Sequence, residues 1–533
     1  PDTLKIDADS VSFYLSQISV LQLKLGKQFN PEFMTNPISA KVSTKTMKRT
    51  LFKQLPAHLL TAACLLWLAS TPTVQAANTS DLPDLGNAGA SLFSKEKEYS
   101  LGQAWLRSFR SQVRTVYDPI LSQYLESLIY RLAEHSELDD RRLELVIVGN
   151  KNLNAFAVPG GVIGVHDGLL LHAKSEGELA AVLSHELAHL SQKHFARGVE
   201  KARRSSIPNM LALLGSMVIA ATAGGDAGMA ALSATQALSL QSRLNFSRQN
   251  ELEADRLGMQ TMARAGMDPN DVPAMFERMQ RASRYYRIPP EFLLTHPVSE
   301  TRISDSKNRA RDYPSQIYTT DNEYDLMRAR VLASYAENAG QAIKRFKSDL
   351  KGETANPTAS RYGLVLAYTE ANKLNSARAA LKPLLLQEPR KIIYLLAQVE
   401  IEIRAGRIKE ALSLLERQLS INPGNHPLTM AYANALLKEG RAKETEMVLL
   451  EHVELHPHDE HVWYLLAETH GLAGNIPGVH QARAEYFILN GVFDEAERQL
   501  IYALKLVRGD YLASAKINER MRSIEEMREA INI

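Results

Sequence analysis

A period of 34 residues runs through the C-terminal part of the chain and constrains its fold more than any other feature. Three kinds of landmark keep this step: Pro389, Pro423 and Pro457; Gly406, Gly440 and Gly474; and Ala377, Ala411 and Thr445. A proline at the end of each unit and a small residue at an inner turn divide the unit into two helices. Because one helix pair cannot bury its apolar face alone, the pairs must stack on one another. The period therefore predicts an α-solenoid.

This period with these landmarks is typical of tetratricopeptide repeats, which we assign to residues 325–510. Gly491 and Ala496 indicate a further partial unit, and residues 511–533 are expected to form a helical tail. The region contains no obvious catalytic residues. We therefore expect a separate helical array whose role is to bind other proteins.

The composition is that of an ordinary globular protein. Hydrophobic residues make up 45% and charged residues 23% of the 533 positions, which excludes a disordered chain and a polytopic membrane protein. The 62 basic and 60 acidic side chains give a formal net charge of +2, so nothing suggests nucleic acid as a partner. Cys64 is the single cysteine, which excludes an intrachain disulfide.

Residues 47–76 have the pattern of a secretory signal peptide. A basic region comes first, an apolar stretch follows at 58–70, and a motif of two small residues flanking Gln75 ends at Ala76. The alternative is a membrane anchor, but the apolar stretch is shorter than the roughly 20 residues that span a bilayer. We predict cleavage after Ala76 and export of the mature chain.

Three other segments carry weaker signals. Residues 1–46 precede the expected start at Met47, with Met34 as the alternative start, and are interpreted as upstream translation without a structural role. Residues 77–100 are polar and are expected to form a flexible lead-in. Residues 208–236 are apolar at first and then rich in small residues. Two interpretations of them stay open: a buried helix or hairpin, and a flap in peripheral contact with a membrane or a partner.

The part between these segments mixes helices with a few strands. Residues 101–137 have helical periodicity, residues 143–148 read as a strand, and residues 154–165 read as a strand, a turn and a strand. Ser175 and Glu178 match a capping box. They predict a helix that continues to about Arg197, where Gly198 stops it.

This helix carries the sequence HELAH at 185–189. His185 and His189 are four residues apart, so both imidazoles leave one face of the helix and can bind Zn²⁺ as a pair. Glu186 is offset around the helix axis. It can reach a metal-bound water without being a ligand and can act as the general base.

A catalytic zinc needs a third protein ligand. Gln192 and Phe195 occupy the positions where one subclass of zinc proteases has Gly and the third His, which excludes that subclass. On a continuous helix His194 lies about 140° from His189, so we interpret it as a surface or structural histidine.

A better candidate for the third ligand is Glu251, which a second helix would bring to the metal. Asp255, one turn further on, could accept a proton from the outer nitrogen of a ligand histidine. An ordinary solvated face is the alternative interpretation of this pair. Glu253 is a competing ligand by spacing alone, but it points about 200° away from Glu251.

Four motifs in order resemble the zinc metallopeptidase family of the HtpX-type and prenyl-CAAX endopeptidases, namely NAFAVPGG at 154–161, HELAH at 185–189, NELEADR at 250–256 and THP at 295–297. The resemblance implies a zincin-type α+β metallopeptidase domain, which we assign to residues 101–315, in a protein that is mainly α with a small β-sheet. It also implies one Zn²⁺ per chain bound by His185, His189 and Glu251, with Glu186 as catalytic base and Asp255 as a supporting residue or proton donor.

The resemblance further implies that residues 154–156 form an edge strand to which a substrate peptide can add. Together with the signal peptide and the repeats, it points to a periplasmic zinc endopeptidase that cleaves misfolded or stalled outer-membrane proteins by attack of zinc-bound water. The repeats would dock clients or the outer-membrane assembly machinery. The alternative is a chaperone or assembly factor whose repeats do the main work and whose zinc is structural. Glu186 favours the enzyme, because a structural zinc has no need of an adjacent Glu.

His296 is followed by Pro297 in a family pattern that ends at Arg302. Three roles of His296 stay open. It could stabilise the transition state, it could occupy the open position of the zinc and block the enzyme, or it could tie its loop to the core.

Overall fold

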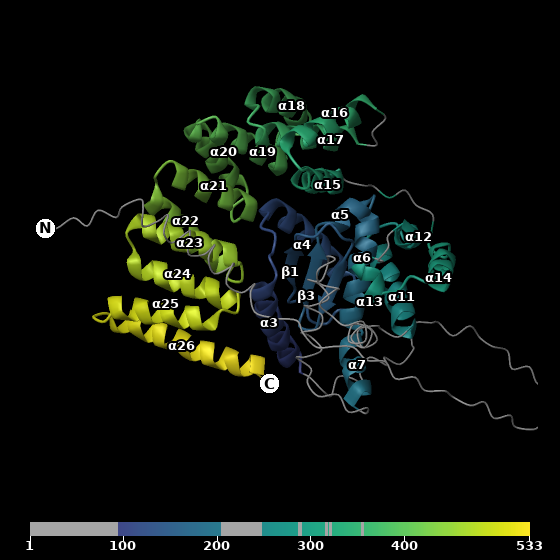
Figure 1. Cartoon of the computed structure of the whole chain (residues 1–533), viewed down its shortest axis with the longest axis horizontal. Coiled ribbons are helices and arrows are strands. Elements are labelled where there is room, and N and C mark those ends of the chain that lie inside the picture. Colours follow the sequence, from purple (N-terminus) through teal and green to yellow (C-terminus); the bar gives the residue numbers. More distant parts are fainter. Residues whose placement is uncertain are drawn as a thin grey trace, which may run out of the picture. The chain divides into compact units, whose positions relative to one another are not determined.

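The computed structural model describes residues 94–203, 248–285, 290–314, 318, 322–352 and 356–532. These residues are mainly helical with one small β-sheet, as the sequence predicts (Figure 1). The predictions for 1–46, for the signal peptide at 47–76 and for 208–236 fall outside the described residues, as does 77–93 of the lead-in. No helix among the described residues combines the length and the apolar character that crossing a membrane requires.

The first described helix begins inside the predicted flexible lead-in, so that part of the prediction is wrong. Helix α3 spans Lys95–Gln112, and the Ser94 side chain caps it by accepting a hydrogen bond from the Lys97 backbone N–H at 3.3 Å. Helix α4 spans Pro119–Glu134. The helical pattern is interrupted between them because Asp118 caps α4 and Pro119 occupies its first position, where no backbone N–H is needed.

The sheet has three strands in the order β1-β3-β2. Strands β1 (Glu144–Val148) and β3 (Val162–His166) are parallel, whereas β2 (Ala155–Val158) is antiparallel to β3. Every residue of the central strand β3 is buried. Strand β2 lies at an edge of the sheet, so within the described residues no other strand pairs with its outer side.

Helix α6 spans Glu176–Ser191, and Ser175 Oγ accepts a hydrogen bond from the Glu178 N–H at 3.0 Å as the capping box predicts. The predicted end at Arg197 is wrong. Lys193 adopts a left-handed conformation with φ 49°, which ends the helix, and α7 (His194–Arg203) starts directly after it. Gly198 lies inside α7 and does not act as a stop.

Further helices complete the N-terminal part of the described chain. Helix α11 packs along α6, and α12 and α14 lie beside them. Their bounds and those of two short helices are α5 (Leu169–His172), α11 (Arg248–Arg264), α12 (Asp271–Tyr285), α13 (Glu291–Thr295) and α14 (Glu300–Ala310).

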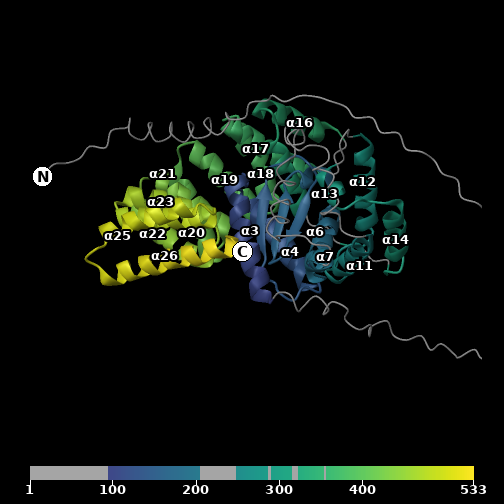
Figure 2. The ribbon, with the colours of Figure 1, turned by 60° about the horizontal axis from the view of Figure 1, so that its bottom comes forward.

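The C-terminal part consists of helices that follow one another in pairs, drawn from green to yellow in Figures 1 and 2. The helices are α15 (Glu323–Ser334), α16 (Ala339–Lys351), α17 (Pro357–Glu370), α18 (Leu374–Gln387), α19 (Ile392–Arg404), α20 (Ile408–Ile421), α21 (His426–Lys438), α22 (Ala442–Leu455), α23 (Glu460–Ala473), α24 (Ile476–Leu489), α25 (Phe493–Leu506) and α26 (Tyr511–Asn532).

The repeat landmarks have the structural roles that the period predicts. Gly406, Gly440 and Gly474 form the turn within a pair with φ of 73°, 79° and 83°, a conformation that glycine adopts readily. Asn372 takes the same turn one period earlier with φ 54°. Asparagine tolerates this conformation, so the repeat continues where the glycine landmark is absent.

The expectation of a separate helical array from residue 325 is wrong. One hydrophobic core extends from Leu121 in α4 to Ile401 in α19. Polar contacts add to this shared core: the Tyr324 hydroxyl donates to the backbone oxygens of Leu170 and Ala173, the latter at 2.9 Å. The first repeats therefore fold against the preceding domain.

The left-handed turns give a test of the repeat geometry. No atom lies within 4 Å of a Cβ added to Gly440, so the cost of Gly440→Ala comes from backbone conformation alone and should be about 1–2 kcal/mol. Gly471→Ala is the matched control. Gly471 lies within helix α23 and has room for a Cβ, so alanine there should leave the stability unchanged or raise it. Denaturant unfolding of the full chain measures both, and an equal effect of the two variants would contradict the assigned turn.

Candidate metal centre

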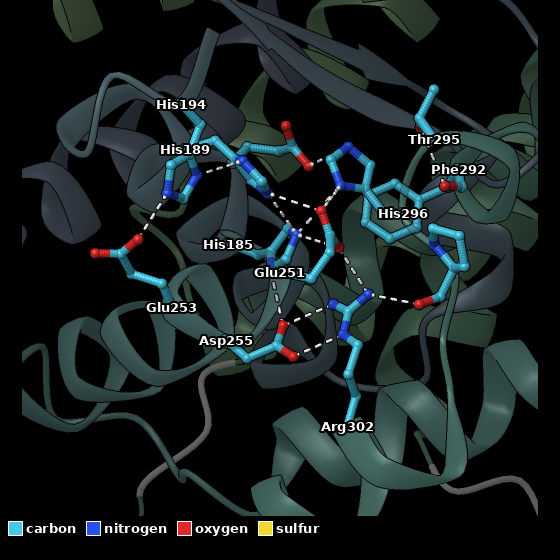
Figure 3. Close-up of polar contacts among 12 residues, drawn as sticks. His185, His189, His194, Glu251, Glu253, Asp255, Phe292, Thr295, His296 and Arg302 are labelled. Atoms are coloured by element: carbon cyan, nitrogen blue, oxygen red, sulfur yellow. Dashed lines mark hydrogen bonds and ion pairs between the residues drawn. The ribbon is translucent and has the colours of Figure 1, made fainter. Parts of the chain in front are cut away.

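Four side chains from three segments meet at one point (Figure 3). Helix α6 supplies His185 and His189, α11 supplies Glu251, and His296 follows α13. One ring nitrogen or carboxylate oxygen from each residue lies within 4.8 Å of the others. All four side chains are buried. The structure thus brings the three predicted ligands together and adds His296 to them.

The atoms that converge are the ones a metal would use. The Nε2 atoms of His185 and His189 are 3.0 Å apart, and the Glu251 carboxylate oxygens lie 3.6 Å and 3.5 Å from them, respectively. Burial lowers the pKa of His185, but Asp255 and Glu251 raise it to about 9. The carboxylates thus favour a positive charge at this point. Imidazole nitrogens with a carboxylate oxygen are a donor set that zinc prefers, so the residues fit a zinc ion.

The outer nitrogens of both ligand histidines have partners. His185 Nδ1 lies 2.9 Å from Asp255 Oδ1, which is the position predicted for Asp255. His189 Nδ1 lies 2.8 Å from His194 Nδ1. These contacts at the outer nitrogens orient the two rings so that each Nε2 faces the common point. Contacts of this kind orient histidine rings in metal sites.

His194 is 1% exposed, so the interpretation as a surface histidine is wrong and the structural one applies. The break at Lys193 is the reason, because it turns His194 back towards His189. Glu253, the competing ligand by spacing, lies 3.1 Å from His194 Nε2 and is absent from the group of four. It also pairs with Arg197 at 2.9 Å.

Arg302 on α14 is a site residue that the sequence analysis did not single out. Its guanidinium donates to both oxygens of Asp255 at 2.6 and 2.7 Å and to Glu251 Oε2 at 2.7 Å. Burial raises the pKa of each carboxyl group, but His296 and His185 hold the pKa of Glu251 well below its usual range, and Arg302 and His185 lower the pKa of Asp255. The only signal in the sequence is that Arg302 ends the motif that contains His296.

Glu186 is buried beside this group. Its Oε1 lies 3.7 Å from His296 Nε2, and burial raises the pKa of its carboxyl group. A raised pKa suits a general base, because the protonated carboxyl group that forms when the base takes a proton is then more stable. The position of Glu186 on α6, next to His185, follows from the spacing in the sequence.

The short helix α13 directs His296 into the centre. The His296 N–H donates to the Phe292 backbone oxygen at 2.8 Å, and the two rings stack at 4.8 Å. His296 Nδ1 lies 3.1 Å from Glu251 Oε1 and 3.4 Å from His185 Nε2. His296 therefore lies in the centre itself and not at its margin.

The edge strand lies close to the centre. Helix α6 packs against β2, and a small cavity is lined by Ala157 of β2, by Pro159 and Gly160 of the turn that follows, and by His189. An extended peptide beside β2 would therefore pass near the histidines.

Comparisons with known proteins agree with this geometry. The model of peptidase family M48 matches residues 119–310, and a tetratricopeptide-repeat model matches residues 402–469. The putative beta-barrel assembly-enhancing protease of Vibrio cholerae is 35% identical over 90% of this chain and 99% of its own length. The beta-barrel assembly-enhancing protease of Escherichia coli is 33% identical over 90% of this chain and 98% of its own length.

A more distant relative matches a shorter part of the chain. The mitochondrial metalloendopeptidase OMA1 of Schizosaccharomyces pombe is 33% identical over 34% of this chain and 50% of its own length. The chain therefore belongs to the beta-barrel assembly-enhancing proteases of peptidase family M48, metallopeptidases that carry tetratricopeptide repeats.

Proposed function

We propose that the chain is a periplasmic zinc endopeptidase that cleaves misfolded or stalled outer-membrane proteins. The observation that carries the proposal is the meeting of His185, His189 and Glu251 at one buried point beside Glu186. The names of the relatives connect such a protease with beta-barrel assembly and so support the substrate class.

His185, His189 and Glu251 would hold the zinc, which when bound acidifies a water molecule and polarises the scissile carbonyl. Glu186 would take a proton from the attacking water and pass it to the leaving amine. Asp255 keeps the proton on the outer nitrogen of His185, as its 2.9 Å contact allows. We therefore assign Asp255 a positioning role.

The substrate would bind as an additional strand along β2. Backbone N–H and C=O groups of an extended peptide pair with an open strand edge whatever the side chains are, which suits a protease with many unfolded clients. The repeats would dock clients or the outer-membrane assembly machinery, since stacked helix pairs offer an extended binding surface. Contact of 208–236 with a membrane, which the sequence leaves open, concerns residues outside those described.

The ligand assignment can be tested by metal content. The double variant His185→Ala, His189→Ala should lower the bound zinc by about one ion per chain, because two of three protein ligands are lost. Elemental analysis of the purified chain measures this loss. His172→Ala is the control, since His172 contacts the Lys151 backbone oxygen outside the centre. Unchanged zinc in the double variant would contradict the assignment.

The general base can be tested by Glu186→Gln. The variant should keep its zinc, because Glu186 is not a ligand, and should lose cleavage of an unfolded outer-membrane protein by about 10²-fold or more. Gel-based cleavage assays together with elemental analysis measure both properties. A chaperone with a structural zinc would show no peptide-bond cleavage in the wild type either, so the same assay separates the two functions.

His296 can be tested by His296→Ala. We propose that His296 would be a further ligand of the zinc at rest and so block the enzyme, because its Nδ1 lies among the atoms that would bind the ion. The variant should then cleave unintended substrates faster than the wild type. A transition-state role predicts the opposite sign, a lower rate with unchanged zinc content. No change in rate would leave His296 with a structural role alone.

A further inference from the structure

A second group of histidines lies in the repeats. His426 is the first residue of α21, His452 lies in α22, and His456 directly follows α22. One ring nitrogen of each lies within 4.8 Å of the others. The three side chains therefore have the spacing of a metal site, although none of them belongs to the catalytic centre.

The three rings are close to one another and are mostly shielded from solvent. His426 Nδ1 lies 2.9 Å from His452 Nε2. The ring centroids are 5.2, 4.7 and 4.6 Å apart. His452 is 2% exposed and the His426 side chain 13%. Three imidazoles in such a place repel one another when protonated, whereas neutral rings can share a cation through their lone pairs.

A carboxylate lies on the outer side of His426. Asp459 Oδ2 is 3.4 Å from His426 Nε2, and Asp459 is held as the cap of α23 by a 2.8 Å hydrogen bond from the His461 N–H. A carboxylate at the outer nitrogen is typical of ligand histidines, since it keeps the proton there and leaves the inner nitrogen free to bind. The inner nitrogen, Nδ1, is the one that faces His452.

An ion has a path to this group. His426, His456 and Asp459 line a cavity of about 520 Å³, which Tyr117 and Glu144 of the preceding domain also line. The walls include carboxylates, among them Glu126. A divalent cation can therefore enter from solvent, and acidic groups favour its approach.

We propose that His426, His452 and His456 bind a second metal ion, a divalent transition metal of the zinc class. Imidazole nitrogens suit such metals, and three of them leave one position for water. The ion would join α21, α22 and the segment that leads into α23.

The place of this site in the fold suggests what the ion does. Four residues after His456, Glu460 pairs with Arg110 of α3 at 3.0 Å, and the next residue, His461, stacks on Tyr117 at 4.1 Å. A metal at His456 would fix this segment and so hold the repeats against the metallopeptidase domain. Removal of the ion should loosen this contact without altering the catalytic centre.

Zinc stoichiometry tests the proposal, with zinc itself as the probe. The wild-type chain should bind two zinc ions, and the double variant His426→Gln, His456→Gln should bind one. His480→Gln is the matched control, because His480 is a half-buried repeat histidine that contacts Gln499 instead. It should keep both ions. Two ions in the double variant, or one ion in both the wild type and the double variant, would overturn the proposal.

A second measurement covers the case in which a variant folds poorly. In the His185→Ala, His189→Ala background, Co²⁺ should still give the visible absorption of a low-coordinate nitrogen site, and zinc should raise the Tm. Both effects should disappear when His456→Gln is added. Absence of both effects in the background itself contradicts the second site. A variant that loses proteolysis but keeps the second ion has a defect in the catalytic centre alone. A result against one of the two proposals therefore does not contradict the other.

Discussion

The rest of the site depends on the ion pairs of Arg302. A domain interior that holds three carboxyl groups and four imidazoles would be unstable without compensation, because burying an unpaired charge is very costly. Arg302 contacts Asp255 and Glu251 with charge-assisted hydrogen bonds of 2.6–2.7 Å. Loss of one partner from such a buried group typically costs about 3–5 kcal/mol. The arginine thus compensates the charges of Glu251 and Asp255 inside a packed core.

Arg302 also connects the ligands to the loop of His296. Its Nη1 donates to the Pro297 backbone oxygen at 2.9 Å and to Glu251 Oε2 at 2.7 Å. The carbonyl next to His296 and the third ligand are therefore held by one guanidinium.

Local rules make part of this structure predictable from the sequence. The spacing of His185 and His189 fixes them on one helix face, and glycine at the repeat turns reflects a left-handed backbone. The break at Lys193 was not predictable, because lysine has no preference for positive φ. Because the sequence predicts a continuous helix through Lys193, it places His194 on the wrong side of the helix. The role of Arg302 and the shared core at Leu121 and Ile401 depend on long-range packing, which periodicity does not reveal.

The first repeats share one hydrophobic core with the metallopeptidase domain, whereas later repeats also have clusters of their own. Helices up to α19 are packed into the same core as α4, and Arg330 of α15 pairs with Asp118, the cap of α4. Helix α4 also touches α6, since the Tyr124 hydroxyl donates to Glu176, the first residue of α6, at 2.9 Å. The later repeats have hydrophobic clusters of their own, for example around Leu449 and Ile488. The later repeats also contact the metallopeptidase domain directly, since α21 packs against α4 and α24 and α26 pack against α3. The Glu460–Arg110 pair at 3.0 Å adds to these contacts.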